Sequence, residues 1–498
     1  MRTLIEKLEQ VQCPERLAAS LQDEPGLVLL HSSLSGTPGG RYSFVTARPF
    51  VTFRSAGSRC QLLWPDGRHV QFGDPWRLLD GWLSRFELHD EVDLPFPLGG
   101  CFGFWGYELK NFLEPRLPRH SINDLELPDC QLGFYDSLVA FDHHIGATWI
   151  LATGFGRDGS RDESRARRQL DFWRERLARM RTEDDTNSLS GFRKTISKIH
   201  SESVQGDRTI TSPISSNLTR QQFIERVQRV QHYVRSGDVY QVNLSQRLST
   251  SVRLAPWKLY QALRGVSPAP FSAYLNCGDF QLASSSPELF LHLSGSKVQT
   301  RPIKGTRPRS PEATRDAQLG YQLQTSAKDM AELVMIVDLL RNDLGKVCEF
   351  GSVQVPDLAR LERFAQVQHL VATVEGLLRP EVTHLDVIAA CFPGGSITGA
   401  PKIRAMEIID ELEPVFRGPY TGAIGYLGFN RESQASIAIR TAICKDGQAH
   451  FQVGAGVVAD SDPESEYNET LAKARGFTKA LGLCSPRYDR FSQWEVRA

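Results

Sequence analysis

An acidic segment near the end of the chain could hold a divalent metal ion. Glu466 and Glu469 are three residues apart, so on a helix their carboxylates would share one face, and Lys473 follows one turn later. Like charges on one face repel each other unless a cation separates them, and oxygen ligands suit a hard divalent ion. Glu332 could add a third carboxylate. The alternative is a solvated acidic helix start, which the helix dipole also favours.

Two further charged side chains could take part in nucleophilic attack or proton transfer. Lys304 lies in a segment with three arginines, 301–309, and neighbouring positive charge lowers the pKa of an amine and makes it nucleophilic. Glu288 follows an apolar run, where partial burial would raise the pKa of its carboxyl group toward that of a general acid. The alternatives are an exposed basic turn for Lys304 and a helix-start carboxylate for Glu288.

A glycine-rich loop, residues 394–402, precedes a helical pattern. Backbone amides in such a loop can approach an anion at the positive end of a helix. The spacing excludes a P-loop, because Lys402 stands three residues beyond Gly399 instead of directly after it. The loop could bind a carboxylate as well as a phosphate, and a tight turn without a ligand is the alternative.

Hydrophobic periodicity predicts the elements that must position these residues. Thr219 and Gln222 form a capping box, and apolar residues at helical spacing continue to Ser236. Two more helices are predicted over 332–341 and 401–412. Strand-like runs cover 26–31, 41–46, 280–284, 423–429, 435–443 and 450–454. We therefore expect an α+β fold in which large antiparallel β-sheets pack together and are covered by helices.

The composition is that of a large globular protein. The chain has 498 residues, of which 41% are hydrophobic, and this is enough for an extensive core. Lys plus Arg and Asp plus Glu number 58 each, so no net charge attracts nucleic acid or an anionic membrane. With no signal peptide and no apolar stretch near the ~20 residues of a membrane span, we expect a cytoplasmic protein. The scattered cysteines predict free thiols.

A polar segment divides the chain. We expect an N-terminal region over 1–155, a charged surface helix and a linker over 156–217, a catalytic region over 218–484 and a tail over 485–498.

Several segments together resemble the chorismate-binding enzymes, the family of anthranilate synthase component I, aminodeoxychorismate synthase component I, isochorismate synthase and salicylate synthase. The matching segments are Gly237–Asn243, Ala331–Leu344, Gln368–Val371, Ser396–Lys402 and Gly454–Asp460, with Leu29–Ser32 and Arg41–Phe44 in the first part of the chain. The resemblance covers over half of the chain and implies the fold of that family.

Two positions separate the members of this family. Gln241 stands where isochorismate and salicylate synthases carry a lysine base, which disfavours addition of water at C2. Lys304, in Pro302–Thr306, stands where anthranilate synthases usually have alanine, and it matches the aminodeoxychorismate synthases. The resemblance therefore implies synthesis of 4-amino-4-deoxychorismate, a precursor of 4-aminobenzoate and folate. Anthranilate synthesis is the enzymatic alternative, and a silent chorismate-binding regulatory subunit is the non-enzymatic one.

The resemblance also implies roles for individual residues. Lys304 would attack C2 of chorismate and form a covalent intermediate, Glu288 would protonate the leaving C4 hydroxyl group, and His369 would position that end of the substrate. Mg²⁺ would be held by Glu332 and Glu469, and by Glu466 through water. The residues that match the family's substrate contacts are Ser396, Thr398, Tyr420, Arg440, Gly454, Ala455, Gly456 and Lys473.

Two partners besides chorismate are implied in the same way. The chain has no glutaminase motif, since Trp105 replaces the glutamine of a nucleophile elbow at 99–105, so ammonia is expected from a separate glutamine amidotransferase subunit. The tryptophan pocket of the family is matched by Ser32, Arg41, Tyr42, Ser43, Pro270, Phe271 and Ser272. His31 replaces an acidic residue that is common in this motif, which predicts the absence of tight feedback inhibition.

Overall fold

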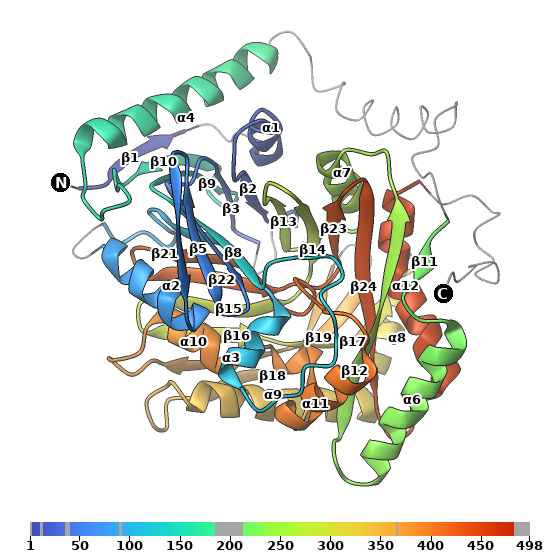
Figure 1. Ribbon diagram of the computed structural model, residues 1–498. Coiled ribbons are helices and arrows are strands. Elements are labelled where there is room, and N and C mark those ends of the chain that lie inside the picture. Colours follow the sequence, from blue (N-terminus) through green and yellow to red (C-terminus); the bar gives the residue numbers. More distant parts are fainter. Residues whose placement is uncertain are drawn as a thin grey trace.

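Two large antiparallel sheets pack face to face, and helices cover their outer faces (Figure 1). The computed structural model describes residues 2–9, 13–34, 40–88, 92–184, 213–364 and 367–482. Within these ranges each sheet has twelve strands. The predicted α+β fold is confirmed.

Sheet A has the strand order β1-β10-β9-β3-β2-β13-β14-β23-β24-β12-β11, and β20 pairs with β12. Its strands are β1 (Leu4–Leu8), β2 (Val28–His31), β3 (Tyr42–Thr46), β9 (Ser137–Asp142), β10 (Ala147–Ala152), β11 (Ser215–Ser216), β12 (Gln241–Ser251), β13 (Phe271–Asn276), β14 (Gln281–Ser286), β20 (Gly399–Ala400), β23 (Thr441–Lys445) and β24 (Gln448–Val457).

Sheet B has the strand order β17-β19-β16-β15-β22-β21-β7-β8-β4-β5-β6, and β18 pairs with β19. Its strands are β4 (Val51–Ala56), β5 (Arg59–Trp64), β6 (Gly67–Phe72), β7 (Gly100–Trp105), β8 (Cys130–Tyr135), β15 (Leu289–Ser294), β16 (Lys297–Arg301), β17 (Ile303–Pro308), β18 (Gln354–Arg363), β19 (Val367–Leu377), β21 (Ala423–Gly428) and β22 (Glu432–Ile437). Both sheets thus combine strands from before and after the polar segment, and the two halves of the chain share one core.

The helices form layers outside the sheets. Sheet A is covered by α1 (Pro14–Ala19), α4 (Glu163–Asp184), α7 (Pro256–Val266) and α12 (Pro463–Ala480). Sheet B is covered by α2 (Pro75–Leu83), α8 (Ala313–Gln324), α9 (Ala327–Gly345) and α10 (His384–Cys391). Two further helices, α6 (Arg220–Arg235) and α11 (Lys402–Leu412), pack beside β12. The short helix α3 (Lys110–Leu113) follows β7.

The helix predictions are confirmed where the structure describes the chain. Helix α6 begins with the predicted capping box, in which Thr219 Oγ1 accepts from Gln222 N and Gln222 Oε1 accepts from Thr219 N. The predicted helices 332–341 and 401–412 lie in α9 and α11. The surface helix of segment 156–217 is α4, and β11 lies near the end of the segment. Residues 185–212 of the predicted linker and the tail at 485–498 lie outside the described residues.

One strand prediction was wrong. The run 435–443 is not a single strand, because β22 ends at Ile437 and β23 begins at Thr441. The chain leaves sheet B and enters sheet A between these strands, and Arg440 adopts a positive φ of 50° in the connection. This break places Arg440 in a site that a continuous strand could not form.

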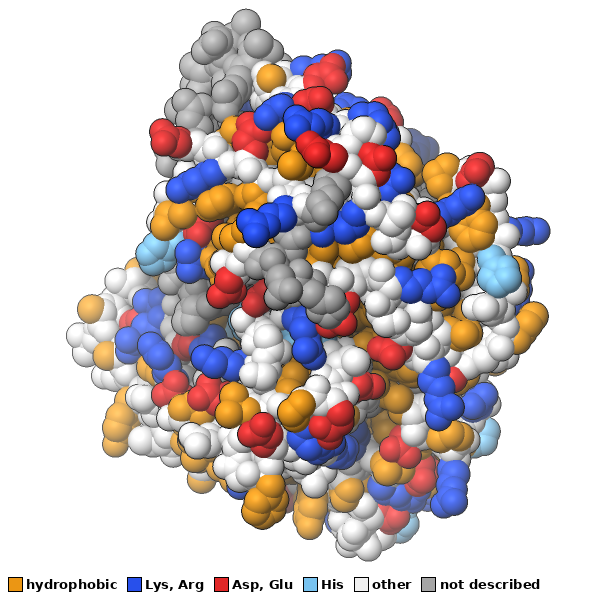
Figure 2. All heavy atoms as spheres, turned by 90° about the vertical axis from the view of Figure 1, so that its left-hand side faces the viewer, with side chains coloured by type: hydrophobic (Ala, Val, Ile, Leu, Met, Phe, Trp, Pro, Cys, Tyr) orange, Lys and Arg blue, Asp and Glu red, His pale blue; other side chains and the backbone are white. Residues whose placement is uncertain are grey.

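The surface agrees with the balanced charge of the sequence. On the face in Figure 2, side chains of Lys and Arg are interspersed with those of Asp and Glu. In the part of the chain that the structure describes, no helix is both long and apolar enough to cross a membrane.

Trp173 anchors α4 on sheet A and provides a test of the packing. Its side chain is fully buried, and its Nε1 donates a hydrogen bond to Ser137 Oγ at 3.0 Å. We expect Trp173→Ala to lower the free energy of unfolding by about 3–5 kcal/mol, measured by chemical denaturation. The matched control is Arg179→Ala on the exposed face of α4, expected to change it by less than about 0.5 kcal/mol. Equal effects of the two substitutions would contradict this packing.

Candidate active site

The chain crosses between the two sheets at two neighbouring places. Glu288 lies between β14 of sheet A and β15 of sheet B, and Arg440 lies between β22 of sheet B and β23 of sheet A. Two backbone hydrogen bonds join the crossings, from Ser285 N to Arg440 O at 3.0 Å and from Ile437 N to Glu288 O at 3.1 Å. A carboxylate and a guanidinium that are distant in sequence therefore lie in one site.

Lys304 lies beside this crossing, on β17 at one end of sheet B. Its Nζ donates a hydrogen bond to the backbone carbonyl of Ser396 at 3.2 Å. The side chain of Ser396 lies near enough to the Glu288 carboxyl group to lower its pKa. Lys304 is therefore held within a strand and Glu288 lies between two strands, so neither occupies the exposed turn or helix start considered as an alternative.

Burial shifts Lys304 and Glu288 toward their neutral forms. Desolvation lowers the pKa of Lys304 and raises the pKa of Glu288, and it outweighs the attraction between their charges, which acts in the opposite sense on both. A neutral amine is a nucleophile, and a neutral carboxylic acid can donate a proton. The pair can thus supply both functions at one place.

His369 lies on β19, next to the strand that carries Lys304. Its Nδ1 is 3.2 Å from the carbonyl oxygen of Gly305 and 2.9 Å from Thr306 Oγ1. Burial lowers the pKa of His369 to about 4, so the ring is neutral near pH 7. Because a carbonyl oxygen can only accept, the proton belongs on Nδ1 and Nε2 remains an acceptor.

Glu466 and Glu469 share one face of α12, as the spacing predicts. Glu466 accepts from Ser461 Oγ at 2.7 Å, and Glu469 forms an ion pair with Lys473 at 2.8 Å. Lys473 also donates to the carbonyl oxygen of Gly454 at 2.8 Å, and this contact joins α12 to β24.

The charge of one predicted metal ligand, Glu469, affects the pKa values of the other two. Burial raises the pKa of Glu332 on α9 and of Glu466, and the charge of Glu469 raises both further. Within the described ranges, no three Asp, Glu, His or Cys side chains are gathered as a ready-made metal site. A set of three carboxylates suits Mg²⁺ chemically. The magnesium site stays a prediction.

Glycines on β24 allow two side chains to pack against the strand. A Cβ atom at Gly454 would lie 2.8 Å from the hydroxyl oxygen of Tyr420, and one at Gly456 would lie 2.2 Å from Nε2 of Gln241. Burial raises the pKa of Tyr420 to about 12, so its hydroxyl group remains a donor near pH 7. Ala455, between the two glycines, is fully buried.

The glycine-rich loop approaches the backbone of β12. Gly399 has a φ of 137°, and a Cβ atom there would lie 2.1 Å from the carbonyl oxygen of Gln241, so only glycine fits. The buried hydroxyl group of Thr398 donates to Gly394 O at 3.1 Å within the loop. At the end of the loop, Lys402 Nζ forms an ion pair with Asp343 of α9 at 2.5 Å.

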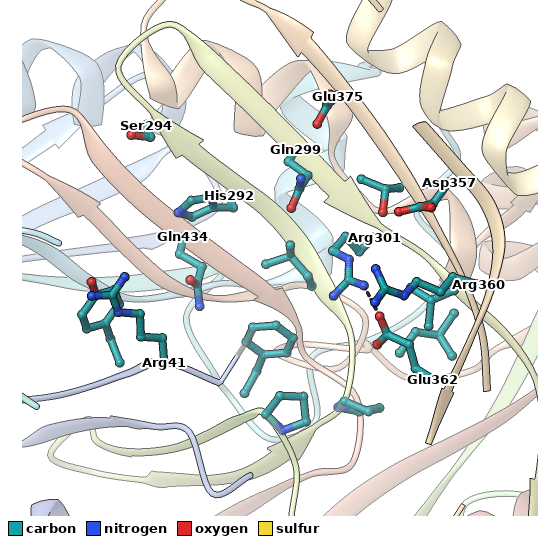
Figure 3. A pocket seen from close by; sticks show the side chains of 18 of the residues that line it. Arg41, His292, Ser294, Gln299, Arg301, Asp357, Arg360, Glu362, Glu375 and Gln434 are labelled. Carbon is teal, nitrogen blue, oxygen red and sulfur yellow. Dashed lines mark hydrogen bonds and ion pairs between the residues drawn. The ribbon is translucent and has the colours of Figure 1, made fainter. Parts of the chain in front are cut away.

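Two adjoining cavities between the sheets contain most of the predicted tryptophan pocket. Arg41, Tyr42, Pro270 and Phe271 line the larger cavity, of about 550 Å³, opposite polar side chains of sheet B that Figure 3 shows pointing inward. Tyr42, Pro270 and Phe271 also line the smaller cavity together with Ser32 and Ser272. The hydroxyl group of Ser43 accepts from Ser32 N and contacts His143. Binding of tryptophan stays a prediction.

Sequence reasoning missed three residues that support the loop. Asn243, Glu413 and Arg417 are joined by hydrogen bonds behind Ser396 and Thr398. Asn243 lies in a matching segment, but nothing in its spacing marks it as a support. Glu413 and Arg417 are four residues apart outside any helix, so the helical pairing rule gives no signal for them.

The chain resembles proteins of one family along most of its length. Residues 40–479 match the family described as chorismate binding enzyme. Aminodeoxychorismate synthase component 1 of Escherichia coli (strain K12) is 40% identical over 460 residues, which cover 92% of this chain and 93% of that protein. Anthranilate synthase component 1 of Synechocystis sp. is 39% identical over 476 residues, which cover 93% and 92%.

A solved structure agrees with these relatives. Anthranilate synthase component I from Streptococcus pneumoniae TIGR4 has a TM-score of 0.69 and 29% identity, with 89% of this chain and 93% of that chain covered. The names of the relatives divide between two activities.

The buried His369 predicts a pH dependence of stability. The pKa is about 4 in the folded chain and 6.5 ordinarily, so the unfolded chain binds more protons between these values and stability falls as the pH falls through this window. The free energy of unfolding is measured by urea denaturation at about pH 8 and about pH 5. We expect it to fall by about 2 kcal/mol less between these pH values in His369→Gln than in the wild type. The control is His232→Gln at an exposed position. An equal effect of this substitution would contradict the view that the buried His369 causes the pH dependence.

Proposed function

Since the chain belongs to the chorismate-binding enzyme family, we propose that it acts as an aminodeoxychorismate synthase component I. In this reaction ammonia replaces the C4 hydroxyl group of chorismate and gives 4-amino-4-deoxychorismate. The observation that carries the proposal is the amine of Lys304, held by the Ser396 carbonyl oxygen beside Glu288, at a position where the family resemblance implies alanine in anthranilate synthases.

The first half of the reaction joins Lys304 to the substrate. Its neutral amine forms a bond to C2, the ring double bond shifts, and the C4–O bond breaks. Glu288 gives its proton to the departing hydroxyl group, which leaves as water. The burial that favours the neutral forms of both residues supports this direction of proton transfer.

The second half releases Lys304. Ammonia forms a bond to C4, the double bond returns, and the C2–N bond breaks, so that lysine leaves as a neutral amine. The new ammonium group on C4 can return a proton to Glu288. We expect the ammonia to come from a separate glutamine amidotransferase subunit.

Other residues would bind and orient chorismate. Arg440 can clamp a carboxylate, and Tyr420 can donate to one beside the Gly454–Gly456 backbone. His369 Nε2 can accept a hydrogen bond at the C4 end. Glu332 and Glu469, with Glu466 through water, would hold Mg²⁺, which supplies positive charge next to the ring carboxylate when bound.

Anthranilate synthesis is the competing function. An anthranilate synthase component 1 is 39% identical to this chain, nearly as close as the aminodeoxychorismate synthase component 1 at 40%. Overall identity therefore does not separate the two activities, and the proposal depends on Lys304.

Product analysis tests the proposal. The purified chain is incubated with chorismate, Mg²⁺ and an ammonium salt, and the products are resolved by chromatography and mass. We expect 4-amino-4-deoxychorismate from the wild type and its loss in Lys304→Ala. Lys445→Ala is the control, because Lys445 is a largely buried lysine that donates to Leu125 O away from the site. Anthranilate from the wild type would contradict the proposal, and chorismate binding without turnover would indicate a silent subunit.

The metal ligands can be tested without turnover. We expect Glu469→Gln to weaken Mg²⁺ binding by about 10- to 100-fold in isothermal titration calorimetry, because one of three carboxylate ligands loses its charge. Glu464→Gln removes an acidic group of the same helix that pairs with Arg220 and should leave the affinity unchanged. Equal Mg²⁺ affinity of Glu469→Gln and the wild type would show that Glu469 is not a ligand.

A further inference from the structure

Arg417 is a fully bonded guanidinium behind the candidate active site. Its side chain is 2% exposed, and that of its ion-pair partner Glu413 is 3% exposed. All five N–H groups of the guanidinium have acceptors. They are Glu413 Oε2 at 2.8 Å, Glu413 Oε1 at 2.7 Å, Asn243 O at 2.6 Å, Ile397 O at 3.3 Å and Thr421 Oγ1 at 3.2 Å.

These contacts join the glycine-rich loop to β12. Ile397 lies between Ser396 and Thr398, and its carbonyl oxygen accepts from Arg417 and from Asn243 Nδ2 at 2.9 Å. The backbone N–H of Asn243 donates to Thr398 O at 2.9 Å. Since the Ser396 carbonyl oxygen holds the amine of Lys304, a shift of this loop would move the nucleophile's partner.

Arg417 also supports Tyr420 from behind. The guanidinium carbon lies 5.6 Å from the centre of the Tyr420 ring and 4.8 Å from that of Tyr107. The side chain of Asn243 lies near the Tyr420 hydroxyl group and lowers its pKa. Arg417 thus contacts two parts of the site, namely the glycine-rich loop at Ile397 and the ring of Tyr420.

The electrostatics suit a permanent structural support. Burial alone would lower the pKa of Arg417, but the Glu413 carboxylate, together with Tyr107 and Tyr420, outweighs burial and raises the pKa, so Arg417 keeps its charge. Glu413 Oε1 also accepts from Ser245 N and Ser245 Oγ, both at 2.8 Å, which fixes the carboxylate to β12. The pair adds no net charge beside a site for an anionic substrate.

Glu108, from the first part of the chain, fixes the backbone at Arg417 and Gly418. The buried carboxyl group of Glu108 accepts from Arg417 N and Gly418 N, both at 2.9 Å. Arg417 is therefore held at its backbone and at every donor of its side chain.

We propose that Arg417 is a positioning residue for chorismate turnover, which fixes the loop of Ser396 and Thr398 relative to Tyr420. The inference rests on the proposed function only in requiring that chorismate reacts in this site. Lysine cannot replace Arg417, because an ammonium group has three donors on one nitrogen and cannot reproduce a planar fork of five.

The test compares two buried arginines that have ion-pair partners near β12. We expect Arg417→Lys to lower kcat by about 30- to 100-fold and to raise KM by less than about threefold, since the loop supports the reacting groups. Arg247→Lys is the control, because Arg247 lies on β12 and pairs with Asp124 away from the loop. It should lower the melting temperature comparably and change kcat by less than about threefold.

A milder variant covers the case in which Arg417→Lys does not fold. Thr421→Val keeps the charge pair but removes one of the five acceptors and the hydrogen bond from Thr421 Oγ1 to Tyr420 O. We expect a fall in kcat of about three- to tenfold and a smaller fall in melting temperature than for Arg417→Lys. Unchanged kcat in Thr421→Val, or an equal fall of kcat in Arg247→Lys, would overturn the proposal. If the wild type makes anthranilate, the proposed function fails while the comparison of rates still tests Arg417.

Discussion

Removal of water from around Lys304 and Glu288 is the constraint on which the site depends. Each group alone would be charged near pH 7, and their mutual attraction favours the charged forms. Desolvation outweighs that attraction at both groups. The surrounding architecture creates this condition, because the two crossings between the sheets, the edge strand β17 and the glycine-rich loop meet around one pair of side chains.

The supports of this pair come from both halves of the chain. Glu108 from the first part holds the backbone of Arg417, and Arg417 holds the loop that contacts Lys304. Each sheet also joins a block of strands from the first half to a block from the second half, at β2 and β13 in sheet A and at β7 and β21 in sheet B. A division of the chain by composition therefore separates segments that are joined in the core, and a change in either half can reach the site through this buried network.

Local patterns in the sequence predicted several elements well. The capping box at Thr219 and the shared face of Glu466 and Glu469 depend on residues within one helical turn, so sequence spacing contains the needed information. Arg440 could not be placed in the same way. The apolar run around Arg440 predicts one continuous strand, and only the passage of the chain from sheet B to sheet A divides this run into β22 and β23. Arg417 was missed because two of its acceptors, Asn243 O and Ile397 O, lie on distant segments of the chain and burial of a charge has no local signature.

The most direct test of the claim that Lys304 is the nucleophile is the mass of the protein after incubation with the substrate. With chorismate and Mg²⁺ but without ammonia, the covalent intermediate should accumulate, because nothing displaces the lysine. Rapid acid quenching followed by peptide mass spectrometry should show Lys304 increased by the mass of chorismate less one water, and no such adduct in Lys304→Ala. An unmodified Lys304 peptide from a chain that still forms 4-amino-4-deoxychorismate once ammonia is added would contradict the account.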